Sequence, residues 1–126
     1  MSTKALILFV HGSRDPRWAE PFRCLQRRVA ERDPELRVEV AFLEHGSPDL
    51  MAAAHALADG GATSIRVVPM FFGRGGHLRD DLPREIDAVR RALPGIAFDV
   101  CEAAGESDRV LDALVDFALG DQNRIR

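Results

Sequence analysis

Segments with strand-like and helix-like patterns alternate along the whole chain. Residues 5–10 (ALILFV) are apolar throughout, which is typical of a strand that is covered on both faces in a parallel sheet. Further strands are expected at residues 36–43, 64–70 and 96–100, each followed by a helical segment. Short connections in such an alternation favour right-handed crossovers between parallel strands. We therefore predict an α/β fold in which one four-stranded parallel sheet is flanked by helices on both faces.

The first two expected helices are defined by an apolar stripe and by their first residues. Before the second strand, apolar side chains recur at spacings of four, three and four residues, as on one buried helical face: Trp18, Phe22, Leu25 and Val29. Pro21 lies in this stripe, so the helix either begins near Glu20, with the proline in its first turn, or kinks there. The alanine-rich segment 49–59 is a strong helix former. Ser47 is expected to cap it, with Pro48 in the first helical position.

The third and fourth helices show the same signs. The third follows a glycine-rich loop, ends at Pro94-Gly95, and carries the stripe Leu82, Ile86, Val89 and Leu93. Ser107 is expected to cap the last helix, whose apolar residues are Val110, Leu111, Leu114 and Phe117.

Composition and charge exclude several classes of partner. A chain of 126 residues suits a single domain, residues 1–126, with 121–126 as a loose tail. The net charge of −3 offers no basic surface to phosphate backbones, so we expect no nucleic-acid partner. Cys24 and Cys101 lack a paired metal-binding spacing, and the first apolar run is too short for a signal or membrane helix. A cytoplasmic protein without a membrane partner is expected.

Three of the four histidines fall after expected strands. His11 follows the first strand, His45 follows the second beside Glu44, and His77 lies in the loop after the third. Ligands of open parallel sheets gather at the carboxyl ends of the strands, so these side chains should share one edge. Imidazole is the commonest protein ligand for late first-row divalent metals, and a neighbouring carboxylate leaves room for exchangeable positions. The pattern therefore favours a site for Co²⁺, Fe²⁺, Ni²⁺ or Zn²⁺.

Each of these residues also has a purely structural interpretation. His11 can be a turn histidine bonded to the backbone, and His77 can cap the helix that follows it. Glu44 can be a solvated carboxylate or an ion-pair partner. His45 is a weaker candidate, and His55, inside the alanine-rich helix, is interpreted as a helix residue without a role in the site.

Four arginines flank the two histidine turns: Arg14, Arg17, Arg74 and Arg79. Guanidinium groups bind carboxylates in a bidentate manner, so a ligand with several carboxylates would explain them. The alternative is that they are exposed residues at helix starts.

Several motifs together resemble the CbiX family of sirohydrochlorin chelatases over nearly the whole chain. They are residues 8–14 (LFVHGSR), 42–44 (FLE), 68–77 (VPMFFGRGGH) and 81–83 (DLP). The length resembles the short form of the family, which is similar to half of the larger two-domain class II chelatases and works as a homodimer. The resemblance implies a lyase that inserts a divalent metal into sirohydrochlorin on a tetrapyrrole or cobalamin pathway. Cobalt is the first expectation and nickel or iron the alternatives, with no cofactor beyond this substrate metal.

The resemblance also implies roles for individual residues. His11 and His77 are the implied metal ligands and catalytic pair, and Glu44 beside them assists metal arrival or proton removal. Sirohydrochlorin carries many carboxylates, which gives Arg14, Arg74 and Arg79 a function in substrate binding.

The chain departs from the family pattern at two places. After the Phe-Leu-Glu triplet, His45-Gly46 stands where the family usually has small or apolar residues, so His45 is either an added ligand or alters the metal preference. No proline precedes Gly105, which affects the expected shape of one wall of the cleft.

Two other functions compete with chelation. The same histidines can store, deliver or sense a metal without tetrapyrrole chemistry. A hydrolase or phosphatase is disfavoured, because the chain has no GxSxG elbow and Val10 stands where a phosphohistidine mechanism needs an arginine.

Overall fold

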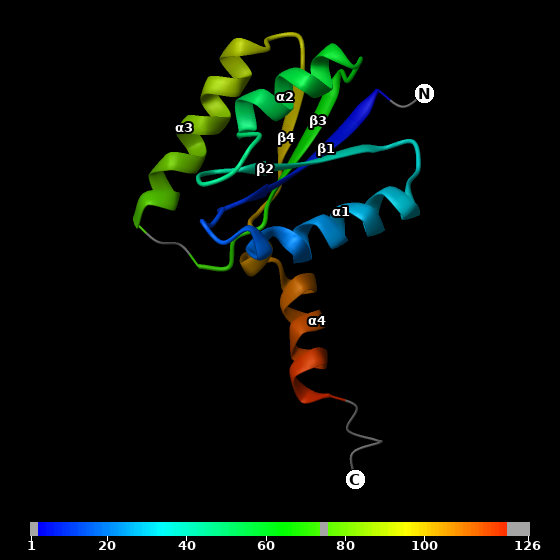
Figure 1. Ribbon diagram of the computed structural model, residues 1–126, viewed down its shortest axis with the longest axis vertical. Coiled ribbons are helices and arrows are strands. Elements are labelled where there is room, and N and C mark those ends of the chain that lie inside the picture. Colours follow the sequence, from blue (N-terminus) through cyan, green and yellow to red (C-terminus); the bar gives the residue numbers. More distant parts are fainter. Residues whose placement is uncertain (1–2, 74–75, 121–126) are drawn as a thin grey trace.

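The computed structural model describes residues 3–73 and 76–120, and only the backbone of residues 76–79. Its strands are β1 (Lys4–Val10), β2 (Arg37–Phe42), β3 (Ser64–Pro69) and β4 (Ala97–Val100). They form one parallel sheet in the order β2-β1-β3-β4 (Figure 1). The predicted four-stranded parallel sheet is confirmed. The continuously apolar segment 5–10 lies in β1, one of the two inner strands. Its side chains are apolar because both faces of this strand are covered.

Helices cover both faces of the sheet. On one face, Leu8 and Val10 of β1 pack with the side chains of α1 (Glu20–Arg32). On the other face, Ile7 and Phe9 pack with α2 (Leu50–Asp59) and α3 (Gly76–Ala92) (Figure 1). Successive β1 residues thus enter opposite cores, as the alternation of a strand requires. None of the helices in the described ranges is long and apolar enough to cross a membrane.

The helix starts resolve two sequence expectations. The helix α1 begins at Glu20 with Pro21 in its first turn, directly after the short helix η1 (Pro16–Ala19), so the proline starts the helix and does not kink it. Ser47 does not cap α2, and that prediction is wrong. Asp49 is the cap, and its carboxylate accepts from the Ala52 N–H at 2.8 Å. The reason is that the carbonyl of Pro48 accepts from the Phe42 N–H at 2.8 Å, which keeps the proline in the loop after β2.

The last helix has an uncovered apolar surface. After η2 (Ala104–Glu106), Ser107 caps α4 (Asp108–Leu119) as predicted, with its hydroxyl oxygen accepting from the Val110 N–H at 3.4 Å. The helix extends away from the carboxyl edge of the sheet (Figure 1). Its large apolar side chains are between 40% and 83% exposed: Leu111, Leu114, Val115, Phe117 and Leu119. The described part of the chain therefore leaves much of this helix's apolar surface open to water.

Candidate functional site

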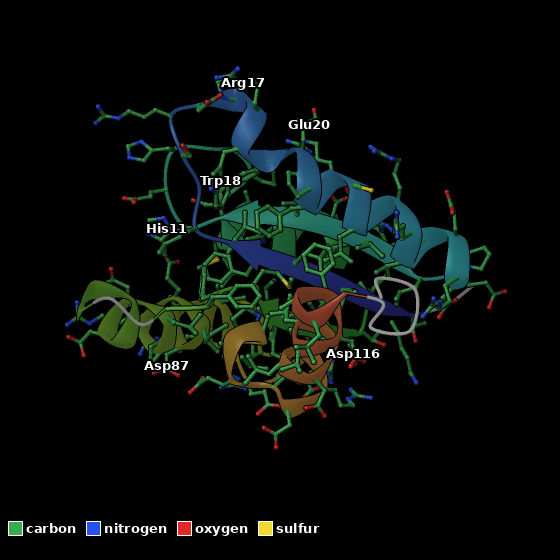
Figure 2. All side chains as sticks on the ribbon, turned by 90° about the horizontal axis from the view of Figure 1, so that it is seen from below. His11, Arg17, Trp18, Glu20, Asp87 and Asp116 are labelled. Atoms are coloured by element: carbon green, nitrogen blue, oxygen red, sulfur yellow. The ribbon has the colours of Figure 1, made fainter. Side chains whose placement is uncertain are left out.

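The carboxyl edge of the sheet brings His11 and Glu44 together. His11 directly follows β1, and Glu44 comes two residues after the neighbouring strand β2. The Nε2 atom of His11 lies 3.4 Å from Oε1 of Glu44, and the two side chains are 45% and 50% exposed. Seen along this edge, His11 lies between the layer of α1 and the layer of α3 (Figure 2). The pair is therefore accessible to solutes from water.

Backbone hydrogen bonds hold this pair in register. The pairing of β1 with β2 continues beyond the strands, since the Leu43 N–H donates to Val10 O at 2.9 Å and the Glu44 N–H donates to His11 O at 3.0 Å. Gly12 is buried beside Glu44 with φ of 101°, a conformation that favours glycine. The position of Glu44 next to His11 is thus set by main-chain contacts, independently of the two side chains.

A local backbone contact orients the His11 ring. Its Nδ1 lies 3.3 Å from the carbonyl oxygen of Gly12. A carbonyl oxygen can only accept, so the contact requires the proton on Nδ1. In the neutral ring, Nε2 then presents a lone pair on the side of Glu44. Such backbone bonding of the second ring nitrogen is the usual way in which proteins orient a metal-binding or basic histidine.

His45 lies on the other side of the same carboxylate. Its Nε2 is 3.9 Å from Oε2 of Glu44, and its side chain is 38% exposed. The residue has φ of 52°, in the left-handed region that few non-glycine residues adopt. Within the described residues, no three His, Cys, Asp or Glu side chains are arranged to hold one metal ion. Glu44 instead lies between two imidazoles, with one oxygen toward each.

The remaining predicted residues are placed only in part. His77 and Arg79 belong to the first turns of α3 by their backbone, but their side chains lie outside the described residues, as does all of Arg74. Arg14 is exposed in the loop after β1. The structure thus brings together His11, Glu44 and His45, and it does not test the predicted contribution of His77.

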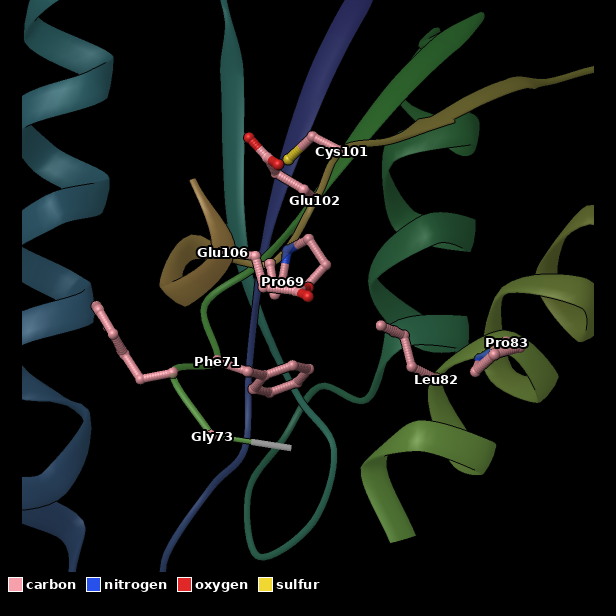
Figure 3. A pocket seen from close by; sticks show the side chains of 10 residues that line it. Pro69, Phe71, Gly73, Leu82, Pro83, Cys101, Glu102 and Glu106 are labelled. Carbon is pink, nitrogen blue, oxygen red and sulfur yellow. The ribbon is translucent and has the colours of Figure 1, made fainter. Parts of the chain in front are cut away.

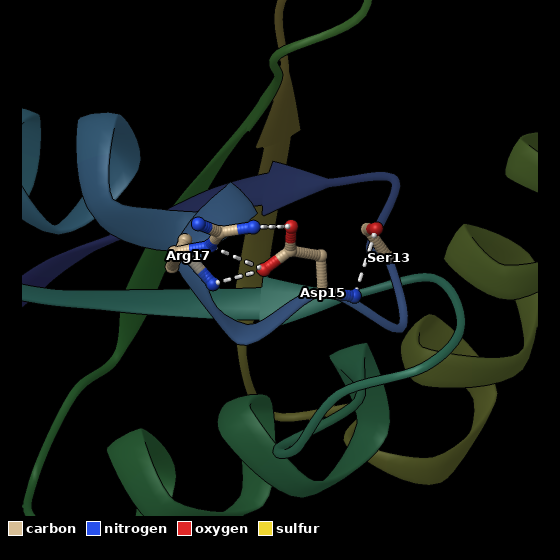
Figure 4. Close-up of polar contacts among 3 residues, drawn as sticks. All are labelled: Ser13, Asp15 and Arg17. Atoms are coloured by element: carbon tan, nitrogen blue, oxygen red, sulfur yellow. Dashed lines mark hydrogen bonds and ion pairs between the residues drawn. The ribbon is translucent and has the colours of Figure 1, made fainter.

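Arg17 and Asp15 form a separate ion pair in the segment between β1 and α1. The Arg17 side chain donates to both carboxylate oxygens of Asp15, at 3.2 and 3.0 Å, and the Arg17 backbone N–H donates to it at 2.9 Å (Figure 4). The Arg17 hydrogen bonds lower the pKa of this carboxyl, the side-chain bonds most strongly. Ser13 Oγ accepts from the Asp15 N–H at 3.2 Å. The Asp15 carboxylate is thus engaged inside its own turn.

An apolar cavity of about 280 Å³ opens at the ends of β3 and β4. Its walls include Pro69 and Phe71 after β3, Leu82 from α3, and Cys101 and Glu102 after β4 (Figure 3). The sheet order places His11 between this cavity and Glu44. The volume is slightly below the roughly 300–1,000 Å³ usual for small-molecule sites, so one copy of the chain encloses only part of a large ligand.

The amino-acid sequence also matches a known protein family. The sequence profile of the CbiX family matches residues 5–118, which is most of the chain. The chain belongs to the CbiX family. The resemblance seen in its motifs is confirmed.

Several members of known function or structure are similar to this CbiX chain. The sirohydrochlorin cobaltochelatase of Sulfurisphaera tokodaii is 28% identical over 86% of both chains. The sirohydrochlorin ferrochelatase of Priestia megaterium is 30% identical over 89% of this chain but only 42% of its own length. A crystal structure described as a putative cobalamin biosynthesis CbiX protein from Marinobacter aquaeolei VT8 superposes with a TM-score of 0.79, at 30% identity, over 92% of this chain and 94% of that chain.

Sequence reasoning did not find the apolar cavity of this CbiX chain. Pro69 and Phe71 belong to the 68–77 motif, with Pro69 in the expected strand and Phe71 directly after it, but the sequence assigned neither of them to a cavity wall. The available signal was that the apolar run continues through Phe71 and Phe72 after the strand should end, although Phe72 is 60% exposed. Cys101 lies in the cavity wall, at the site edge of the sheet.

Proposed function

We propose that this protein inserts a divalent metal ion into sirohydrochlorin, with His11 and Glu44 as the groups that hold the ion before insertion. The single observation that carries the proposal is the separation of 3.4 Å between His11 Nε2 and Glu44 Oε1. When Nδ1 carries the proton and donates to Gly12 O, Nε2 of a neutral His11 ring presents a lone pair to the Glu44 carboxylate, so two electron-rich atoms lie near each other. A cation between them, a proton or a metal ion, removes this repulsion.

The same separation fits two ligands of one metal ion. Bonds from a late first-row divalent metal to imidazole nitrogen and carboxylate oxygen are about 2.0–2.2 Å long. Two such donors on a tetrahedral ion therefore lie about 3.3–3.5 Å apart. Two protein ligands leave other coordination positions to water or to His77, so the ion stays exchangeable. A substrate metal has to be released, and such a site permits this.

Insertion also needs an acceptor for protons. The incoming M²⁺ replaces two pyrrole N–H protons, so each turnover releases two protons. Once the ion has left His11 and Glu44, the imidazole Nε2 and the carboxylate are both free to accept a proton. We propose that His77 shares these roles as second imidazole.

The macrocycle is proposed to lie against the apolar cavity at the ends of β3 and β4. Pro69 and Phe71 offer an apolar wall there, at the same edge of the sheet as His11 and Glu44. Carboxylates at the rim of the macrocycle would bind Arg14, Arg74 and Arg79, because guanidinium groups pair with carboxylates in a bidentate manner.

Cobalt is the proposed metal, with nickel or iron as alternatives. The ligand set of imidazole and carboxylate suits all three ions. Similar proteins include both a cobaltochelatase and a ferrochelatase. Affinity alone follows a common order among divalent metals, so the preference has to be measured as insertion rate.

A second copy of the chain is proposed to complete the enzyme, as a homodimer that covers α4. A helix of this length is marginal in water without packing, and here five large apolar residues of α4 are exposed. The Priestia megaterium ferrochelatase matches this chain over less than half of its own length, so a relative exists with room for a second such unit. A second copy would also enclose more of a macrocycle than the cavity of about 280 Å³ does alone.

The decisive experiment is metal insertion followed by absorption spectroscopy. Sirohydrochlorin is mixed with Co²⁺, Ni²⁺ or Fe²⁺, with and without the purified protein. We expect a faster spectral change with protein, fastest with Co²⁺, and a loss of about 100-fold or more in His11→Ala and in His77→Ala. His55→Ala, which removes an exposed imidazole on α2, is the matched control. Rates equal to the protein-free mixture would reject chelation, and Co²⁺ binding without insertion would favour the alternative function of metal delivery or sensing.

A further inference from the structure

We propose that His45 is a metal-capture residue, which takes the ion from water together with Glu44 Oε2 and passes it to His11. The inference rests on the proposed chelatase function and deepens it, because it states how the substrate metal reaches the inserting pair.

The first observation is that Glu44 offers a different oxygen to each imidazole. Oε1 lies 3.4 Å from His11 Nε2, whereas Oε2 lies 3.9 Å from His45 Nε2. The distance between His45 and Glu44 exceeds the separation of about 3.3–3.5 Å for two ligands of one tetrahedral ion. These two side chains must therefore move slightly closer together to hold a metal ion. The pair formed by His11 and Glu44 needs no such movement. The ion is therefore held more weakly by His45 and Glu44 than by His11 and Glu44, as a transfer toward His11 requires.

The second observation is a hollow of about 180 Å³ beside His45. It lies between the loop after β2 and the start of α1, and its walls include Ser13, Trp18 and Phe42. Asp15 also lines it, but Arg17 binds that carboxylate through both oxygens, so Asp15 does not compete for the ion. Among the described side chains that line the hollow, His45 carries the imidazole.

The order of the strands places His45 and the apolar cavity on opposite sides of His11. The strands run β2-β1-β3-β4, so His45 follows the edge strand β2, His11 follows β1, and the apolar cavity follows β3 and β4. Metal and macrocycle therefore approach His11 from opposite sides. A macrocycle bound over the cavity leaves the path through His45 open, and rotation of the Glu44 carboxylate carries the ion inward without release to water.

The test measures Co²⁺ loading alone, by stopped-flow absorption of the bound ion, in the full chain. The variant is His45→Asn, because asparagine tolerates the backbone conformation of residue 45 but removes the imidazole. We expect association to slow by roughly tenfold, the lower end of the effect of removing a supporting group beside the ligands of a metal site. Dissociation should slow by the same factor, since the ion leaves by the same path, so the affinity stays unchanged. His55→Asn, the control, should match the wild type.

The outcomes separate this proposal from the chelatase function. Wild-type loading rates in His45→Asn would overturn the capture role while leaving insertion untouched. A loss of affinity with unchanged association would also overturn it, because His45 would then be a permanent ligand. Slower loading in His45→Asn together with no insertion by the wild type would support capture and reject the chelatase. If the wild type binds no Co²⁺, both fail.

Discussion

The backbone of Glu44 occupies the space next to Gly12 that any larger residue would need. A β-carbon at position 12 would lie 1.7 Å from the carbonyl oxygen of Glu44, and the φ of 101° at Gly12 already disfavours other residues. The glycine that follows His11 is therefore part of the mechanism that places Glu44 beside it.

Gly12→Ala should both destabilise the protein and displace Glu44. Backbone strain alone predicts a decrease in the free energy of unfolding of about 1–3 kcal/mol, and the collision with Glu44 adds to it. Urea unfolding measures this change, and Co²⁺ binding by the folded fraction measures the site. Gly95→Ala is the matched control, since a β-carbon at position 95 would meet nothing within 4 Å and the φ there is not positive. Equal stability of both variants would contradict this interpretation.

Glu44→Gln should separate metal binding from stability. The substitution keeps the size of the side chain but removes its charge, and a glutamine amide can donate to the free Nε2 of His11. The free energy of unfolding should therefore change by less than about 0.5 kcal/mol, as for most exposed substitutions. Co²⁺ affinity, measured by calorimetry, should fall by at least about tenfold because a charged ligand is lost. Unchanged affinity would remove Glu44 from the metal site.

Arg14→Ala and Arg74→Ala should weaken binding of the macrocycle without affecting the metal. Each removes a proposed carboxylate partner, so the KM for sirohydrochlorin should rise by roughly fivefold to tenfold, equivalent to about 1–1.4 kcal/mol, while Co²⁺ affinity stays constant. Arg17→Ala is the control, because Arg17 already pairs with Asp15. Arginine variants whose KM equals that of the control would reject the predicted substrate contacts.

Leu114→Asp should convert a dimer into monomers. The substitution places a charge in the exposed apolar stripe of α4, which is costly to bury against a second copy. Sedimentation equilibrium should show a dimer for the wild type and a monomer for the variant. Asp116→Asn changes a residue on the side of the same helix that faces away from Leu111 and Leu114, and this variant should remain dimeric. A monomeric wild type would refute the proposed assembly.

Local patterns in the sequence were enough to predict the strands and the edge at which His11 and Glu44 meet. The run 5–10 had to be an inner strand, and the residues after parallel strands share one edge whatever the details of packing. For the start of α1, local rules left two alternatives, a helix beginning near Glu20 or a kink at Pro21, and the structure has the first.

Other features depended on contacts between distant residues. Ser47 was predicted as the cap because nothing in the sequence shows that the Pro48 carbonyl accepts from the Phe42 N–H. The cavity beside Phe71 requires β3, β4 and α3 to be placed first. The position of His45 on the outer oxygen of Glu44 depends on a left-handed turn that no short motif specifies.

The hydrogen bonds that extend past β1 and β2 anchor residue 44 through its main chain and leave its side chain free to vary. The side chain at position 44 can thus be replaced while its backbone keeps the same place. Cysteine or histidine at this position would place a softer donor atom beside the His11 imidazole. A single substitution could therefore change which metal ion the protein prefers.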